Sequence, residues 1–159
     1  MVTARGQAKL DGSPKDVDRE FVTLFNIYDE NLSPWLDYNI GHFASEGDKV
    51  DKEDGDFVES NLKHSINGYL YGNVPGLTMV NGERVRWYAM AAGTETGLHT
   101  PHWHGNTVLT MGMRMDNIEL LPTSMKTADM VPDARGKWLY HCHVNDHIAG
   151  GMLALYKVK

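Results

Sequence analysis

The stretch that decides the fold is WLYHCHVNDHIAGGM, residues 138–152. Its first half contains aromatic and apolar residues that favour a β-strand. Side chains on a strand alternate between its two faces, so His141 and His143 point to one side and Cys142 points to the other. The strand therefore presents imidazoles on one face and a thiol on the opposite face.

Further strand-like runs lie outside this stretch, and clusters of Gly, Pro, Asn and Asp separate them. They cover residues 20–28, 77–88, 107–115 and 152–158. No long segment shows the 3.6-residue period of an amphipathic helix. The pattern predicts a single all-β sandwich with a helical turn in an insertion.

The segment LTMVNGERVRWY, residues 77–88, places Asn81-Gly82 between two strand-like runs. Asn-Gly is the strongest short-range signal for a two-residue hairpin turn. The segment therefore predicts a β-hairpin, and its second strand should turn Val85 and Trp87 toward the core.

The length and charge of the chain exclude several classes of protein. The 159 residues suit one domain, which we place at residues 20–159, behind a polar N-terminal arm at residues 1–19. Fifteen basic against twenty-one acidic residues give a net charge of −6, the wrong sign for binding nucleic acid or anionic lipid. No run approaches the roughly 18 apolar residues of a membrane span. The one cysteine excludes a disulfide within the chain.

Six of the eight histidines fall in two short segments, residues 99–104 and 141–147. From them and the residues nearby we predict a first site made of one thiol, two imidazoles and one thioether: Cys142, His99, His147 and Met152. Two imidazoles and a thiolate, with a thioether as a weak axial ligand, are what an electron-transfer copper needs. The five-residue steps from Cys142 to His147 and on to Met152 let a loop leave the strand and return.

The opposite face of the strand offers a second site made of imidazoles alone. It would collect His102, His104, His141 and His143. Four neutral imidazoles with no soft ligand suit Cu(II) or zinc, and they leave open positions for oxygen or a small anion. We expect catalysis at this second site where copper occupies it.

The segments HTPHWHG and WLYHCHVNDHIAGGM resemble the copper motifs in the last domain of multicopper oxidases, above all the ceruloplasmin and hephaestin branch. The segments EFVTLFNIYDEN and LKHSINGYLYGNVPGL are also similar to that branch, so the resemblance covers residues 20–158. It implies the Greek-key sandwich of the cupredoxin fold and copper as the cofactor. By the same resemblance, the first site would hold a type 1 copper, His102 a type 2 copper, and His104, His141 and His143 a type 3 pair.

The resemblance implies a second site that this chain does not complete. The trinuclear cluster of the family takes eight histidines, four of them from a partner domain with two further His-x-His motifs, and this chain has no other such motif. Only His42 and His64 remain, so a ring of identical chains would supply at most six histidines at each interface. Two interpretations of the chain follow. It is a fragment or subunit that needs a histidine-rich partner, or it is a stand-alone cupredoxin whose second site holds fewer metal ions. If Met1 to Lys159 is the whole protein, the second interpretation is favoured. By analogy with the trimeric copper nitrite reductases, we expect a homo-oligomer and take a homotrimer as the first hypothesis.

These sites predict a copper-dependent redox protein. It would transfer single electrons at the type 1 copper and oxidise or reduce a small molecule at the second, interfacial copper. The alternative is a pure electron carrier with one copper per chain, no turnover and a redox protein as its partner. Oxygen, nitrite, nitric oxide, iron and phenols are all candidate substrates. Because the protein is expected to use copper, we expect it outside the reducing cytoplasm: in the periplasm, outside the cell or at the cell surface. A leader peptide would already have been removed from this sequence.

Less specific explanations exist for several residues. Cys142 also fits a buried thiol or a structural zinc ligand, and the four-histidine face also fits an empty remnant of the family site. His64 fits a hydrogen-bonded strand histidine, and His42 has no predicted role. The methionines in TMGMRM, residues 110–115, fit packing better than a path for Cu(I). The acidic residues 46–59 fit a solvated loop better than a surface that steers ferrous iron.

Overall fold

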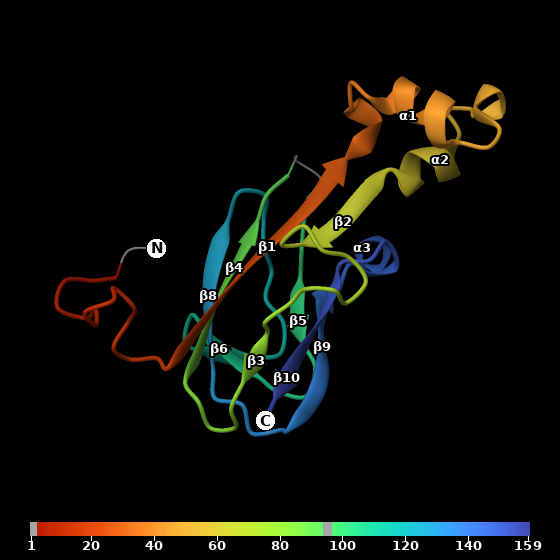
Figure 1. The fold of residues 1–159 in the computed structure, drawn as a ribbon. Coiled ribbons are helices and arrows are strands. Elements are labelled where there is room, and N and C mark those ends of the chain that lie inside the picture. The colour runs from red at the N-terminus through yellow and green to blue at the C-terminus, as the bar shows by residue number, and fades with distance from the viewer. Residues whose placement is uncertain (1–2, 94–96) are drawn as a thin grey trace.

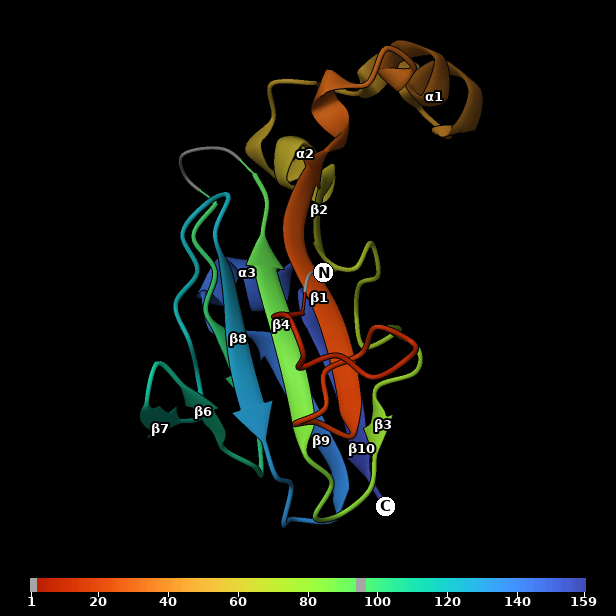
Figure 2. The same cartoon turned by 90° about the vertical axis from the view of Figure 1, so that its left-hand side faces the viewer.

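Two β-sheets packed face to face form the body of the protein in the computed structural model, which describes residues 3–93 and 97–159 (Figures 1 and 2). Strands take up 38% of the described residues and helices 16%, which confirms the predicted all-β class. The two sheets share a single hydrophobic core. The prediction of one sandwich domain is therefore confirmed.

The six-stranded sheet contains β1 Arg19–Asp29, β2 Leu62–Ile66, β4 Val85–Ala91, β6 Val108–Thr110, β7 Met113–Met115 and β8 Met125–Met130. The four-stranded sheet contains β3 Thr78–Met79, β5 Pro101–Trp103, β9 Gly136–Cys142 and β10 Leu153–Val158. The strand orders are β2-β1-β4-β8-β6-β7 and β3-β10-β9-β5. Both sheets are mixed, because β1 runs parallel to β4 and β3 runs parallel to β10, while the other neighbours are antiparallel.

Alternate residues of the facing strands fill the space between the sheets. Val85 and Trp87 on β4 are fully buried, as predicted. The Trp87 ring lies 4.9 Å from the ring of Tyr140 on β9 and 5.7 Å from that of Trp103 on β5. Large buried aromatic rings contribute much of the hydrophobic stabilisation of a core. The same packing fixes β5 and β9, which carry most of the predicted metal ligands.

The hairpin predicted at Asn81-Gly82 is wrong. The strand before the turn, β3, pairs with β10, whereas the strand after it, β4, pairs with β1 and β8 of the other sheet. The N–H groups of Asn81 and Gly82 donate to the carbonyls of Lys159 and Pro132. Gly82 has the positive φ of 81° that such a turn requires. The turn therefore exists, but it carries the chain from one sheet to the other, because both flanking runs bury their apolar faces in the shared core.

Between β1 and β2 the chain makes an excursion that projects from one end of the sandwich (Figure 1). It contains two short 3-10 helices, Glu30–Leu32 and Gly47–Lys49, and two α-helices, α1 Leu36–Phe43 and α2 Gly55–Ser60. No residue of these four helices is buried, and the acidic side chains of residues 46–59 are exposed. The predicted helical turn in an insertion is confirmed, and the acidic side chains of this stretch are solvated as expected, although part of it is helical. Within the described ranges, no helix has the length and apolar character needed to cross a membrane.

The segment before β1 folds back on itself and contacts the sandwich. An isolated bridge pairs Ala8 with Pro14, and Val17 is buried. Asp16 forms an ion pair of 2.9 Å with Arg86 on β4. Arg86 is also paired with Asp129 on β8 at 2.7 Å, so this segment is held against the outer face of the six-stranded sheet.

Candidate metal centre

Both predicted sites are built around the end of β9. The antiparallel register between β9 and β5 places Cys142 opposite Pro101 and His141 opposite His102. Cys142 is fully buried in the core between the sheets. His141 points the other way and contacts His102 across the pair of strands. The alternation along the strand thus separates thiol from imidazoles, as the sequence predicts.

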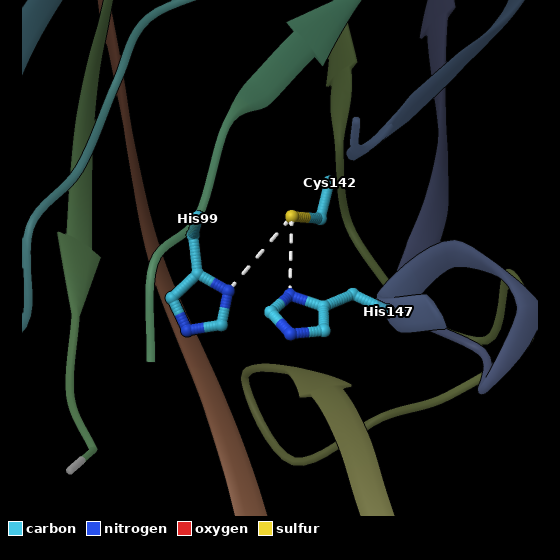
Figure 3. A group of neighbouring side chains, drawn as sticks. All are labelled: His99, Cys142 and His147. Atoms are coloured by element: carbon cyan, nitrogen blue, oxygen red, sulfur yellow. Dashed lines mark hydrogen bonds between the residues drawn. The ribbon is translucent and has the colours of Figure 1, made fainter. Parts of the chain in front are cut away.

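The inner cluster consists of His99, Cys142, His147 and Met152, and all four are buried. Cys142 Sγ lies 3.8 Å from His99 Nδ1 and 3.5 Å from His147 Nδ1 (Figure 3). These three donor atoms lie within 4.8 Å of one another. His99 precedes β5, whereas His147 belongs to the short helix α3, Asn145–Ala149, which follows β9. Two separate parts of the chain therefore converge on one point.

Backbone hydrogen bonds hold the members of the inner cluster in place. His99 exchanges two such bonds with Leu120, of 3.0 and 2.8 Å. Met152 donates its N–H to the carbonyl of His147 at 2.9 Å and accepts the N–H of Cys142 at 3.0 Å. The loop that leaves β9 after Cys142 therefore returns to it at Met152, as the five-residue spacing predicts.

Burial sets the protonation of the inner cluster. It lowers the pKa of His99 to about 4, with a further contribution from His147, and it lowers the pKa of His147 as well. Burial also raises the pKa of the Cys142 thiol, although the Thr100 N–H donates to Sγ at 3.4 Å. Neutral imidazoles are ready to bind a metal ion, whereas a protonated thiol needs a cation that displaces its proton. The donor set fits a soft, redox-active ion such as copper.

His64 on β2 lies against the inner cluster, a contact that sequence reasoning missed. Its ring lies 5.2 Å from that of His147, and its Nε2 lies 2.9 Å from Glu59 Oε1. The side chain is buried, which confirms the predicted hydrogen-bonded strand histidine. The glycine at position 150 is the sequence feature that agrees with this contact, because a Cβ added to Gly150 would lie 2.3 Å from His64 Cδ2. Only glycine fits there without displacing the imidazole.

A cavity of about 860 Å³ is lined by Gly150, the residue that lies against His64, and by residues at the end of the sandwich that carries the excursion. Glu59 and Asp146 both line it, together with Tyr69 and Tyr71. The charges of these two carboxylates oppose the effect of burial on the pKa of His147. Two acidic groups therefore stand close to one member of the inner cluster.

The outer cluster consists of His102, His104, His141 and His143. His141 Nε2 lies 3.2 Å from His102 Nδ1 and 3.0 Å from His104 Nε2, and these three nitrogen atoms lie within 4.8 Å of one another. The ring of His143 lies 5.1 Å from that of His102. The structure therefore brings all four predicted histidines together, three of them with nitrogen atoms directed at one point.

The outer cluster is more accessible to solvent than the inner one. His104 and His143 are exposed, His102 is half-buried and only His141 is buried. Burial lowers the pKa of both His102 and His141. A carboxylate oxygen of Asp116 lies 3.6 Å from His102 Nε2. The open side leaves room for groups from outside the chain.

A hydrogen bond links the two clusters directly. His141 Nδ1 donates to the carbonyl oxygen of Cys142 at 2.7 Å. In a neutral imidazole this leaves Nε2 with a free lone pair, and that atom faces His102 and His104. The backbone of the thiol residue thus fixes which nitrogen His141 offers to the outer cluster.

Two other features noted in the sequence lie outside both clusters. His42 is exposed on α1 and stacks on Tyr38 with 5.0 Å between ring centroids. Met115 packs against the core, which confirms the predicted packing role for that residue. Met111 and Met113 are exposed instead, because they sit at the tip and start of the β6–β7 hairpin.

A family model described as multicopper oxidase matches residues 44–159. The chain belongs to the multicopper oxidases. Copper is therefore its cofactor and redox chemistry its general function, as the resemblance of the two histidine segments implies.

Two relatives illustrate the position of this chain among multicopper oxidases. Hephaestin from Rattus norvegicus is 46% identical over 99% of this chain and 14% of its own length. Ferroxidase HEPHL1 from Homo sapiens is 44% identical over 92% of this chain and 13% of its own length. The chain thus spans only 13–15% of the length of the curated relatives it matches.

Solved structures of multicopper oxidases share the fold at low sequence identity. A multicopper oxidase from Campylobacter jejuni, described as a metallo-oxidase, is 18% identical, with a TM-score of 0.63 over 95% of this chain and 32% of that chain. Another multicopper oxidase structure has a TM-score of 0.65 over 94% of this chain and 46% of that chain, at 19% identity. These matches confirm the predicted cupredoxin sandwich.

Proposed function

We propose that this multicopper oxidase domain holds a type 1 copper in the inner cluster and transfers electrons one at a time. The convergence of one thiol and two imidazole nitrogens, with donor atoms within 4.8 Å of one another in a buried site, carries this proposal. Copper bound there would supply a one-electron couple suited to a mixed sulfur and nitrogen donor set.

The chain keeps these ligands dry and in fixed positions. His99, Cys142 and Met152 are at most 1% exposed, so water has little access to the ion. Met152 is held through its backbone to two other members of the cluster, which suits a weak axial thioether. The Thr100 N–H donates to Sγ and draws charge away from a thiolate, which favours the reduced ion.

We propose a second copper at the outer cluster, bound by the imidazoles of this chain and covered by groups from another domain or another chain. The exposure of His104 and His143 supports this, because histidines in such a cluster need a covering surface to exclude water. A histidine-rich partner domain fits the small share of its relatives that this chain spans. A homotrimer is the alternative arrangement. In either case the Cys142 carbonyl and His141 would form a short route for an electron between the clusters.

We propose ferrous iron as the substrate, oxidised outside the reducing cytoplasm. One of the relatives is named a ferroxidase, and the two carboxylates that line the cavity, Glu59 and Asp146, act electrostatically on His147. Carboxylate and imidazole groups suit Fe²⁺, and Glu59 and Asp146 would hold the ion next to the inner cluster. Fe²⁺ would leave as Fe³⁺ after giving one electron to the inner cluster.

A pure electron carrier is the second candidate function. It is favoured by one observation: the inner cluster is complete within this chain, whereas the outer cluster is open. Such a carrier would bind one copper and exchange electrons with another redox protein.

Copper content, visible absorption and EPR of the copper-loaded chain distinguish these functions. More than one copper per chain, with type 1 and type 2 signals, is expected for the oxidase. One copper with a type 1 signal alone would favour the carrier. The absence of an intense sulfur-to-copper band would overturn the type 1 assignment itself.

The substrate is tested separately by Glu59→Gln and Asp146→Asn in the copper-loaded protein with its partner surface present. Both variants should raise the KM for Fe²⁺ and leave the sulfur-to-copper band in place. Glu53→Gln is the matched control, because Glu53 is an exposed acid in the same excursion and does not line the cavity. Equal effects of the three variants would contradict an iron site beside His147.

A further inference from the structure

A buried hydrogen-bond network lies beneath His104 and uses residues that belong to neither cluster. Tyr156 on β10 is fully buried, and its hydroxyl donates to the carbonyl of His104. Asn106, also buried, donates Nδ2 to the same hydroxyl oxygen at 2.9 Å. Asn106 Oδ1 accepts the backbone N–H groups of Asp133 and Ala134, each at 3.1 Å. The network thus ties the turn after β5 to β10 and to the segment before β9.

The direction of the hydrogen bonds in this network is fixed by its donors. Asn106 Oδ1 is occupied by two backbone N–H groups, so the amide presents its NH₂ group to Tyr156. A tyrosine hydroxyl has a single proton to donate. Because the hydroxyl oxygen accepts from Asn106, its one proton is free to bond the carbonyl of His104.

Backbone contacts, rather than side-chain packing, hold His104 where it is. Its side chain is exposed, while its N–H donates to the carbonyl of Leu139 at 2.9 Å. The next residue, Gly105, has a φ of 72° and lies against Trp138, where an added Cβ would come within 2.3 Å of the ring. From this fixed backbone the imidazole reaches His141 at 3.0 Å.

We propose that Asn106 and Tyr156 are positioning residues that hold His104 in the metal-binding geometry of the outer cluster, a role that rests on the proposed second copper. An exposed ligand on a mobile backbone loses conformational freedom when the ion binds, and a prefixed backbone avoids that cost. Removing the Tyr156 hydroxyl releases the His104 carbonyl and leaves the atoms of the inner cluster unchanged. Loss of such supporting groups typically costs about 10–100-fold in metal affinity.

The experiment is a Cu(II) titration of the full chain and of Tyr156→Phe. The sulfur-to-copper absorption band reports the inner cluster, and the type 2 EPR signal reports the outer cluster. We expect Tyr156→Phe to weaken the second ion by about tenfold and to leave the band unchanged. Tyr140→Phe is the matched control, because Tyr140 is equally buried and its hydroxyl bonds Thr23 in the core at 2.8 Å. It should lower the unfolding temperature without weakening the second ion.

Asn106→Asp tests the same network from its other end. The carboxylate keeps an acceptor for the Asp133 and Ala134 N–H groups but offers Tyr156 an acceptor in place of a donor. The hydroxyl proton should then turn away from His104, so we expect the same loss as in Tyr156→Phe. Because both changes act on one hydrogen bond, the double variant should bind the second ion no more weakly than either single variant.

The outcomes separate this role from the proposed second copper. A wild-type chain that takes up no second ion overturns both. A wild-type chain that binds it, together with Tyr156→Phe and Asn106→Asp variants of equal affinity, overturns only the positioning role. Parallel loss of the absorption band and the second ion in Tyr156→Phe would also overturn it, because the residue would then support the fold as a whole.

Discussion

The inner and outer clusters lie on opposite sides of β9 and both contain histidines, yet they differ sharply in how deeply their side chains are buried. His99 is 1% exposed and Cys142 is fully buried, whereas His104 and His143 are exposed. A single sandwich can enclose a complete site for one ion in its core. A site on the outer face of a sheet needs a second surface to exclude water.

The donor groups of the two clusters suit different ions. Burial in the inner cluster keeps the imidazoles neutral and raises the pKa of the thiol, so a soft cation must displace the thiol proton. The outer cluster has imidazoles and a nearby carboxylate, Asp116, which suit Cu(II) or zinc. The hydrogen bond from His141 to the Cys142 carbonyl couples the two sites without giving them a shared ligand.

Cys142→Ser should produce the largest effect and break the inner cluster alone. A serine hydroxyl stays protonated at neutral pH and gives no sulfur-to-copper absorption. We expect the intense visible band to vanish and the affinity of the inner cluster for copper to fall by more than about 100-fold, while the outer cluster keeps its ion. Absorption and EPR on the copper-loaded variant check both statements. A retained band would contradict the proposed thiolate ligand.

His102→Ala should have the complementary effect and break the outer cluster alone. We expect the variant to lose the second ion and turnover and to keep the sulfur-to-copper band unchanged. Among the described residues, the His102 ring contacts His104, His141 and His143 and no member of the inner cluster. His143→Ala should act in the same direction. His42→Ala is the control, since His42 is an exposed histidine stacked on Tyr38 of α1. Loss of the band in His102→Ala would show that the clusters are not independent.

The inner cluster could be predicted from the sequence because most of its geometry is local. Strand alternation decides on which face Cys142 lies, and the loop from Cys142 to Met152 returns to β9 through hydrogen bonds between near neighbours. The outer cluster follows from the same alternation, since His102 pairs directly with His141 in the register of β5 and β9.

The features that the sequence did not predict depend on pairs that lie far apart in the chain. Asn106 and Tyr156 are 50 positions apart, and no local pattern connects them. His64 reaches His147 only because β2 and α3 meet in the folded chain. The turn at Asn81-Gly82 is present. The strands on its two sides pair in different sheets, because each buries its apolar side chains in the core that the two sheets share. Local chemistry predicts turns and faces, whereas packing decides which segments meet.

Gly150→Ala should have an intermediate effect and perturb the inner cluster by steric pressure. The φ of Gly150 is an ordinary −74°, so the obstacle to a side chain is the lack of space beside His64 and not backbone strain. We expect a loss of about 1–3 kcal/mol in the free energy of unfolding and a shifted absorption band as His64 moves against His147. In Gly55→Ala, the added Cβ meets nothing within 4 Å, and this control should be neutral or stabilise by about 0.4–1 kcal/mol. Urea unfolding of both variants provides the measurement, and equal stabilities would contradict the contact.

The smallest effect is expected at Asp18 and Arg84, an exposed ion pair that lies outside both clusters. Hydrogen bonds from Arg84 lower the pKa of Asp18 from 3.8 to about 2. Because this folded-state pKa lies below that of the unfolded chain, the pair adds stability above about pH 4, and the contribution is lost as the pH falls toward 2. The side chains of Arg84 and Asp18 are 54% and 44% exposed, so salt should screen most of the interaction.

Asp18→Asn should therefore reduce the fall in unfolding temperature of the metal-free chain between about pH 5 and pH 2.5, and only at low salt. Arg84→Met should have a similar effect, and the double variant should add little to either, because all three remove one interaction. An unchanged acid dependence in Asp18→Asn would contradict the contribution of this pair.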